Sequence, residues 1–235
     1  MQQTPVEEEE EYSIHPLLHS SLPTLAQFVQ DSKLGLTINR VLVKDWPNLA
    51  AQKEHYTKSI EANFENEASG RWKVVVGGGE DGEMVGHLVL TRVGRGDGKG
   101  GGHGEEGGGK PGGRTAPGFM NDAVFAAVMD AVEALAVPLS LDRLELTHIY
   151  IAPSHRRHGL GSRLLQLAIS KAEEAGVPLM LASEPEAHGF FVKRGFADRG
   201  YVDIDLAKWA EEKSGFGIFR LRGMEMKRRD EGGEN

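Results

Sequence analysis

A short segment rich in arginine, histidine and glycine separates two regular stretches of the sequence, and its residue types are suited to binding an anion. It runs from 153 to 162 and reads Pro-Ser-His-Arg-Arg-His-Gly-Leu-Gly-Ser. Backbone N–H groups at a glycine-rich turn that opens a helix point into one concavity, where the helix dipole adds positive potential. Gly159 and Gly161 allow phosphate oxygens to approach the backbone, and Arg156, Arg157 and His158 supply charge or further donors.

A strand, a helix and a second strand must hold this segment in place. Residues 141–153 alternate like a strand, residues 161–176 have helical periodicity, and residues 177–183 form a second apolar run. Ser162 lies near the predicted start of the helix, and Gly176 followed by Pro178 marks its end. Two strands that bracket one helix of this length predict a parallel βαβ unit with a right-handed crossover.

The rest of the chain predicts a mixed α/β sheet. Strands at 71–76 and 84–93 are separated by a glycine-rich turn that favours an antiparallel hairpin. Further strands are predicted at 201–206 and 217–227. Helices are predicted at 14–30, 47–64, 119–136 and 186–194, the third capped by Asn121 or Asp122.

Composition divides the chain into one domain with polar extensions. We expect a single domain at 13–228, a disordered acidic tail at 1–12 that includes Glu7 to Glu11, and a second tail at 229–235. Within the domain, residues 94–118 are so rich in glycine and so poor in apolar side chains that we expect a disordered insert.

Charge and composition exclude several classes of function. The net charge of -8 argues against general affinity for nucleic acid, and the absence of cysteine excludes disulfides and thiolate chemistry. No apolar run approaches the roughly 20 residues of a membrane span, so no membrane association is predicted. We expect a cytoplasmic protein, with the nucleus left open. No metal site is predicted, because His155 and His158 have no further ligand nearby.

Two motifs resemble those of the GNAT superfamily of N-acetyltransferases. Arg156, Gly159 and Gly161 fill the defining places of its motif A, with Ile149, Ile151 and Pro153 in the lead-in. Downstream, Lys193, Gly195 and Phe196 fit the end of its motif B. The resemblance covers residues 141–206 well, and residues 14–93 only in the order of their elements.

The resemblance implies a GNAT fold, which is an α/β (α+β) fold. Its mixed, mostly antiparallel sheet of six to seven strands splays at the parallel βαβ unit and carries helices on both faces. It further implies that acetyl-CoA is the acyl donor, with its pantetheine arm between the splayed strands. The implied cofactor contacts are Ile149, Tyr150, Ile151, Arg156, Arg157, His158, Gly159, Leu160, Gly161, Ser162 and Lys193.

In this family an amine attacks the thioester directly, and a base on the fourth strand removes its proton. Glu145 stands at the position where several relatives place that base, and partial desolvation in a cleft would raise its pKa. The alternative for Glu145 is a residue at the end of the strand that faces solvent or pairs with Arg143. His148 is the rival base. Strict alternation places it on the face opposite Glu145, unless a bulge, common in this family, reverses the parity.

The acid that protonates the departing thiolate is not evident from the sequence. Relatives commonly have a tyrosine where this chain has Phe191, and a cofactor-contacting asparagine near the place of Glu184. Water or Tyr201 could replace the missing proton donor.

Two other functions remain alternatives. One is a non-catalytic protein of the same fold that binds or senses acyl-CoA. The more remote one is a dinucleotide-binding oxidoreductase, although Leu164 stands at the place of the third glycine of GxGxxG. The acceptor is expected to be an amine of a small molecule or peptide, and the sequence does not choose between them.

Overall fold

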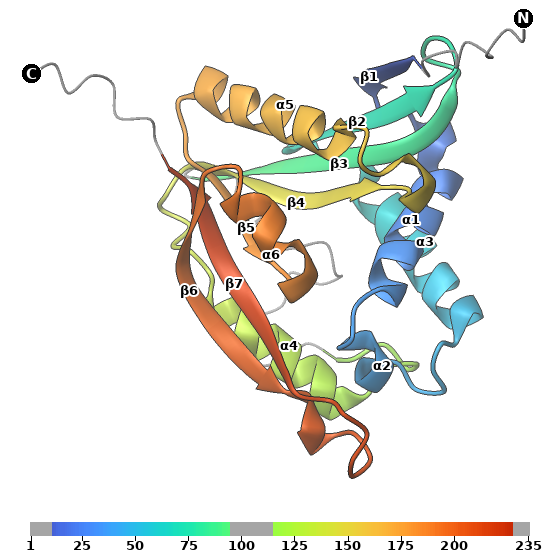
Figure 1. The fold of residues 1–235 in the computed structure, drawn as a ribbon, viewed down its shortest axis with the longest axis vertical. Helices are drawn as coiled ribbons and strands as arrows, with labels where there is room; N and C mark the ends of the chain where they lie inside the picture. The colour runs from blue at the N-terminus through green and yellow to red at the C-terminus, as the bar shows by residue number, and fades with distance from the viewer. Residues whose placement is uncertain (1–10, 95–114, 228–235) are drawn as a thin grey trace, which may run out of the picture.

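The computed structural model describes residues 11–94 and 115–227, which form one seven-stranded sheet with helices on both faces (Figure 1). Its order is β1-β2-β3-β4-β5-β7-β6. The β4–β5 pair is parallel and every other neighbouring pair is antiparallel. The mixed sheet and its single parallel pair confirm the predicted fold class. The strands are β1 (Tyr12–Pro16), β2 (Ser69–Val76), β3 (Glu83–Val93), β4 (Arg143–Ile151), β5 (Leu179–Ser183), β6 (Phe196–Asp205) and β7 (Ile218–Met226).

Six α-helices lie within the described ranges, and the predicted helices beyond residue 30 are confirmed. They are α1 (Leu22–Leu34), α2 (Asn39–Leu42), α3 (Leu49–Phe64), α4 (Asp122–Ala134), α5 (Leu160–Ala175) and α6 (Pro185–Val192). As predicted, Asn121 caps α4, since its side chain accepts a hydrogen bond from the backbone N–H of Ala123 at 3.1 Å. No helix in the described parts of the chain combines the length and apolar character needed to cross a membrane.

The prediction of a helix over residues 14–30 was wrong in its first half. Residues Tyr12–Pro16 form β1, which pairs with the edge of β2, and helix α1 starts only at Leu22. Pairing with β2 satisfies the backbone of this segment, which outweighs its weak helical pattern, and Pro23 lies in the first turn of α1, where proline is tolerated. Because β1 includes Tyr12, the predicted tail extends too far. Its residues 1–10 lie outside the described part of the chain, as do 228–235.

Most of the predicted glycine-rich insert at 94–118 also lies outside the described residues. Its described end is packed rather than free: Ala116 contacts the apolar cluster formed by α2, α4, β6 and β7. Just beyond it, Met120 forms an isolated antiparallel bridge with Val43. The segment that leads into α4 is therefore fixed against the domain.

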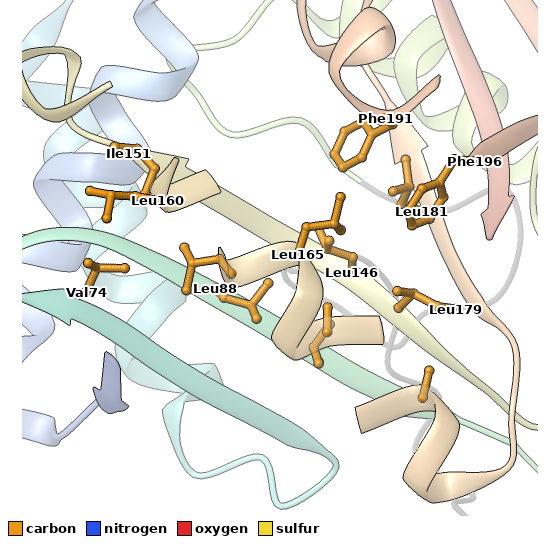
Figure 2. Packing of buried hydrophobic residues seen from close by; sticks show 14 of the residues in the cluster. Val74, Leu88, Leu146, Ile151, Leu160, Leu165, Leu179, Leu181, Phe191 and Phe196 are labelled. Carbon is orange, nitrogen blue, oxygen red and sulfur yellow. The ribbon is translucent and has the colours of Figure 1, made fainter. Parts of the chain in front are cut away.

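The main core lies between α5 and the sheet. Leu160, Leu164 and Leu165 of α5 are each at most 2 % exposed and pack on the β3–β4 surface. Figure 2 shows Leu160 and Leu165 meeting the layer that contains Leu88, Leu146 and Ile151. Burial of this apolar stripe fixes the position of the α5 N-terminus relative to the end of β4.

Candidate active site

Strands β4 and β5 diverge soon after they begin to pair, which confirms the expected splay. Their parallel pairing includes only Leu144 with Leu179 and Glu145 with Met180, although β4 continues to Ile151. Beyond Glu145, the edge of β4 that faces β5 pairs with no other strand in the described part of the chain. Backbone polar groups at such an opening are available to a ligand.

The arginine- and glycine-rich segment forms the start of α5, as the sequence predicts. Gly159 is the N-terminal cap of α5 in a left-handed conformation, with φ of 76°. This conformation favours glycine. At Gly161, an added Cβ would lie 3.3 Å from the ring of Phe190, so the turn also requires a small residue there. The first N–H groups of α5 have no intrahelical acceptor and are free to bind an anion.

A cavity of about 430 Å³ follows this turn and the end of β4. All predicted cofactor contacts except His158 and Lys193 line it. The structure adds five lining residues that were not predicted as contacts. The complete lining is Ile149, Tyr150, Ile151, His155, Arg156, Arg157, Gly159, Leu160, Gly161, Ser162, Ala187, Phe190, Phe191 and Arg194.

Arg194, rather than its neighbour Lys193, reaches the glycine turn at the start of α5. Its guanidinium donates to Ser162 Oγ at 2.6 Å and lies 3.8 Å from the centre of the Phe190 ring. Lys193 is exposed to solvent. Arg194 therefore lines the cavity, and Lys193, the contact that the resemblance implies, does not.

His158 binds another part of the protein. Its Nδ1 lies 2.8 Å from the hydroxyl of Tyr12, and His155 Nδ1 lies 3.2 Å from the same hydroxyl. Arg163 also donates to the backbone carbonyl of Tyr12 at 3.1 Å. His158 therefore joins the turn to β1 in this structure and does not line the cavity.

A second cavity, of about 700 Å³, meets the first. It extends between α1, α2 and α3 on one side and β4, α4 and the β6–β7 pair on the other. The residues that line both cavities are Ile149, Tyr150, Arg156, Ala187 and Phe191. A ligand at the α5 turn and a second molecule in the larger cavity could therefore meet at the end of β4.

A hydrogen-bonded chain of two histidines and a serine lines the larger cavity at β4. His87 Nε2 lies 2.6 Å from His148 Nδ1, and His148 Nε2 lies 3.3 Å from Ser32 Oγ. Ser32 donates its only hydroxyl proton to the carbonyl of Val29 at 2.7 Å. Its oxygen therefore accepts from His148 Nε2–H, and His148 Nδ1 accepts from His87 Nε2–H. This arrangement leaves one imidazole nitrogen whose lone pair accepts no hydrogen bond. It is His87 Nδ1, which is buried without a partner among the described residues.

Burial keeps both histidines neutral. It lowers the pKa of His148 to about 3, with the positive charge of Lys33 as a second cause. The pKa of His87 lies well below its usual value, first because the ring is fully buried and then because of His148. Burial disfavours the charged form of an imidazole, so the pair carries no charge at neutral pH.

A bulge in β4 places Glu145 and His148 on one face of the sheet. Val89 pairs with His148 and Leu90 pairs with Leu146, so Thr147 is an extra residue on β4. This insertion reverses the alternation, as the sequence analysis allowed. His148 faces the cavity beside α1, where Phe28 stacks near His87 at 6.1 Å between ring centres.

The structure does not bring Glu145 to either cavity. Its carboxylate lies 2.7 Å from the guanidinium of Arg143, and the two side chains are 13 % and 5 % exposed. Neither residue is part of the lining of the two cavities. The ion-pair alternative for Glu145 is therefore the one observed, and His148 is the predicted base that lies at the site.

Tyr201, predicted as a substitute acid, also lies away from the cavities. It is 58 % exposed on β6, where the guanidinium of Arg220 stacks 4.0 Å from its ring centre. Phe191 lines both cavities and is only 4 % exposed, but it carries no proton to donate. Tyr150, predicted only as a cofactor contact, has a hydroxyl and lines both cavities. Burial, and then Asp31, raise the pKa of Tyr150, so its hydroxyl is protonated at neutral pH.

The sheet with one splayed parallel pair, and the glycine turn that leads into the helix between those strands, are the features of the GNAT fold. Residues 120–196 match the model of the Acetyltransferase (GNAT) family. We identify this segment as a GNAT acetyltransferase segment, in a chain that has the GNAT fold. No curated protein matches the chain by sequence.

Solved structures with this fold span almost the whole chain. A histone acetyltransferase HPA2 and related acetyltransferase from Corynebacterium glutamicum is 15 % identical, with a TM-score of 0.57, covering 93 % of this chain and 97 % of that chain. NAA60 of Arabidopsis thaliana, solved with a bisubstrate analogue, is 10 % identical, with a TM-score of 0.51 and coverage of 92 % and 97 %. At these identities the likeness shows the fold alone. The fold excludes the dinucleotide-binding alternative, which requires a doubly wound, mostly parallel sheet.

Proposed function

We propose that this protein is an N-acetyltransferase that transfers the acetyl group of acetyl-CoA to a primary amine by direct attack. The observation that carries the proposal is the junction of two cavities at the end of β4. One follows an anion-binding turn and the other contains a neutral histidine pair. The two molecules that react could reach this junction from different sides.

The residues of the smaller cavity fit the donor. The N–H groups at the start of α5 suit a pyrophosphate, and Arg156, Arg157 and Arg194 add positive charge around it. The free edge of β4 beyond Glu145 suits the amide groups of the pantetheine arm. The same edge offers a backbone N–H to polarise the thioester carbonyl.

His148 is the side chain we assign to accept the proton of the attacking amine. The amine nitrogen forms a bond to the thioester carbon, its proton leaves to an imidazole nitrogen, and the carbon–sulfur bond then breaks. His148 holds a proton at Nε2, so it takes up another at Nδ1, which requires the hydrogen bond from His87 Nε2–H to open. Ser32 and His87 are therefore positioning residues: Ser32 keeps the proton of His148 on Nε2, and His87 controls access to Nδ1.

Tyr150 is the side chain we assign to the departing thiolate. It lines both cavities, its hydroxyl is protonated at neutral pH, and the Arg156 guanidinium lies 5.6 Å from its ring centre. A hydroxyl at this junction can donate a hydrogen bond to the sulfur as negative charge develops there.

Phe191 gives specific support to a second candidate, a non-catalytic acyl-CoA-binding protein. It occupies the junction where relatives commonly place a tyrosine, and it cannot donate a proton. Such a protein would bind acetyl-CoA without releasing thiol when amines are added.

Two measurements test the proposal. Calorimetry with acetyl-CoA is compared for the wild type, Gly161→Glu and the control Gly217→Glu, whose added Cβ would meet nothing within 4 Å. We expect Gly161→Glu to abolish binding through steric and charge conflict with the phosphates, and the control to bind normally. Thiol release is then measured with a panel of polyamines, amino acids, alkylamines, arylamines and peptides. Turnover with any amine supports the proposal, and binding without turnover across the panel supports the second candidate.

A further inference from the structure

The larger cavity continues past the histidines to an apolar end, and this end has a composition of its own. It is formed by α2, α4, β6 and β7, and among the described residues that line it from α4, β6 and β7 none is charged. Ile38 and Met120, just before α2 and α4, and Leu42 of α2 also line this end. The complete apolar lining here is Ile38, Leu42, Met120, Phe125, Val128, Met129, Val132, Ile204, Phe219 and Leu221.

The wall formed by α4 comes from the connection between β3 and β4. These strands are antiparallel neighbours, which a two-residue turn can join, so the sheet itself does not require a helix there. The segment before α4 is held in place by two backbone hydrogen bonds. Asn121 N–H donates to Leu42 at 2.7 Å, and Lys44 N–H donates to Phe119 at 2.8 Å. In Figure 1, α4 lies along β6 and β7 with α2 near it.

The side chains at this end are buried from bulk solvent and yet border empty space. Phe125, Phe219 and Leu221 are 6 %, 5 % and 7 % exposed, and all three line the cavity of about 700 Å³. A close-packed protein interior would fill such a space with its own side chains. An apolar cavity of this size suits an apolar ligand group, whose transfer from water is favourable.

Beside the histidines, the lining of the same cavity carries charged groups of both signs. Asp31, Glu184 and Glu186 line it there, and Lys33 lies 4.0 Å from Glu184. Arg156 belongs to the anion-binding turn, and Arg71 donates to the backbone carbonyls of residues 63 and 69. The carboxylates of this lining can attract an ammonium group, and the neutral histidines line the same cavity.

We propose that the acceptor is a primary amine with an extended alkyl or arylalkyl body, held with its nitrogen at the histidine pair and its apolar body against α4. This inference rests on the proposed acetyl transfer, since it names the acceptor of that reaction. The polar lining beside the histidines receives the amine, and the wall formed by α4 favours a longer apolar body.

The test uses the full-length protein and n-alkylamines from butylamine to octylamine, which differ only in chain length. We expect kcat/KM to rise about fourfold for each added methylene until the cavity is filled. The matched probe 1,8-diaminooctane carries a second charge into the apolar end, and it should be at least about 100-fold poorer than octylamine. Three outcomes would overturn the inference without contradicting acetyl transfer. They are a kcat/KM that does not change with chain length, a kcat/KM for 1,8-diaminooctane equal to that for octylamine, and a peptide acetylated in preference to every alkylamine.

Variants on α4 locate the effect. Val128→Asn places a polar side chain in the cavity wall, and it should lower kcat/KM for octylamine about tenfold or more, with a smaller effect on butylamine. The control Ala126→Asn changes the exposed face of the same helix and should keep the chain-length series of the wild type. If kcat/KM depends on chain length in the same way in the wild type and both variants, α4 does not form the wall that contacts the alkyl chain.

Binding separates this inference from the proposed chemistry. If no amine releases thiol, acetyl transfer fails, and calorimetry of butylamine and octylamine with the CoA-saturated protein still measures the preference of the cavity. Tighter binding of octylamine, lost in Val128→Asn, would support the apolar site on its own. Equal or undetectable binding of both amines would overturn it.

Discussion

The imidazole rings of His87 and His148 stack with their centres 4.7 Å apart and their planes within 8°, joined by a 2.6 Å hydrogen bond between His87 Nε2 and His148 Nδ1. The two residues come from adjacent strands, and the bulge at Thr147 brings them onto the same face. Among the described residues, no carboxylate pairs with either histidine to favour its charged form, so burial dominates and both remain neutral.

Replacement of His148 should lower turnover much more than replacement of Glu145. We expect His148→Gln to reduce kcat by about 10²–10⁴-fold with little change in acetyl-CoA affinity, because a general base is lost and the phosphate-binding turn is untouched. Glu145→Gln should keep the kcat of the wild type and lower the free energy of unfolding by about 1–3 kcal/mol, since it removes the charge that Arg143 pairs with.

Steady-state kinetics and urea denaturation of both variants check this prediction. If Glu145→Gln loses activity while folded and His148→Gln does not, the base is Glu145 and its pairing with Arg143 must open during catalysis.

The histidine pair should make stability fall as the solution becomes acidic. An unfolded histidine has a pKa of about 6.5, whereas the pKa of His148 in the folded protein is about 3. Between these values the unfolded state binds a proton that the folded state does not. The free energy of unfolding therefore drops by up to about 1.4 kcal/mol per pH unit for each such histidine. Above about pH 6.5 neither state is protonated, and the pair adds no pH dependence.

Urea denaturation at pH 7.5 and pH 5.0 measures this difference. His148→Gln should show a smaller loss than the wild type, and His19→Gln, which changes an exposed histidine, should match the wild type. Equal losses in wild type and His148→Gln would show that His148 is not held neutral by burial.

Arg194 and Lys193 form a matched pair for testing the phosphate-binding turn. Arg194→Gln removes the guanidinium that donates to Ser162 and should weaken acetyl-CoA binding about tenfold or more, since charge-assisted hydrogen bonds at the α5 N-terminus are lost. Lys193→Gln removes an exposed charge outside the cavity and should change affinity less than about threefold. Calorimetry at two salt concentrations measures both, and equal losses would mean that Lys193 reaches the cofactor as the sequence predicted.

Tyr150 and Tyr201 allow the same substitution at a site residue and at a surface residue. Tyr150→Phe removes the only hydroxyl we assign to the thiolate, and it should lower kcat about 10- to 100-fold while the ring and its packing remain. Tyr201→Phe should match the wild type, because its ring stacks on Arg220 outside both cavities. Thiol-release kinetics with one good acceptor measures kcat for both variants and shows which hydroxyl acts. Loss of activity in Tyr201→Phe alone would restore Tyr201 as the acid.

The sequence by itself determined the glycine turn at the start of α5 and the βαβ unit around it. The spacing of Arg156, Gly159 and Gly161 is local, because the residues that make a helix N-terminus are consecutive in the chain. Helix ends such as Gly176 and caps such as Asn121 are local in the same way. Such features can be read from neighbouring residues, and the structure places them where the sequence predicts.

Only the tertiary structure decided which side chains meet at the junction of the cavities. His87 and His148 are 61 residues apart, and their contact depends on strand register and on one bulge that reverses alternation. Pairing of Glu145 with Arg143, the exposure of Tyr201 and the strand at Tyr12–Pro16 likewise depend on partners distant in sequence or on burial. The wall formed by α4 arises from packing of one connection against β6 and β7, which no local pattern encodes.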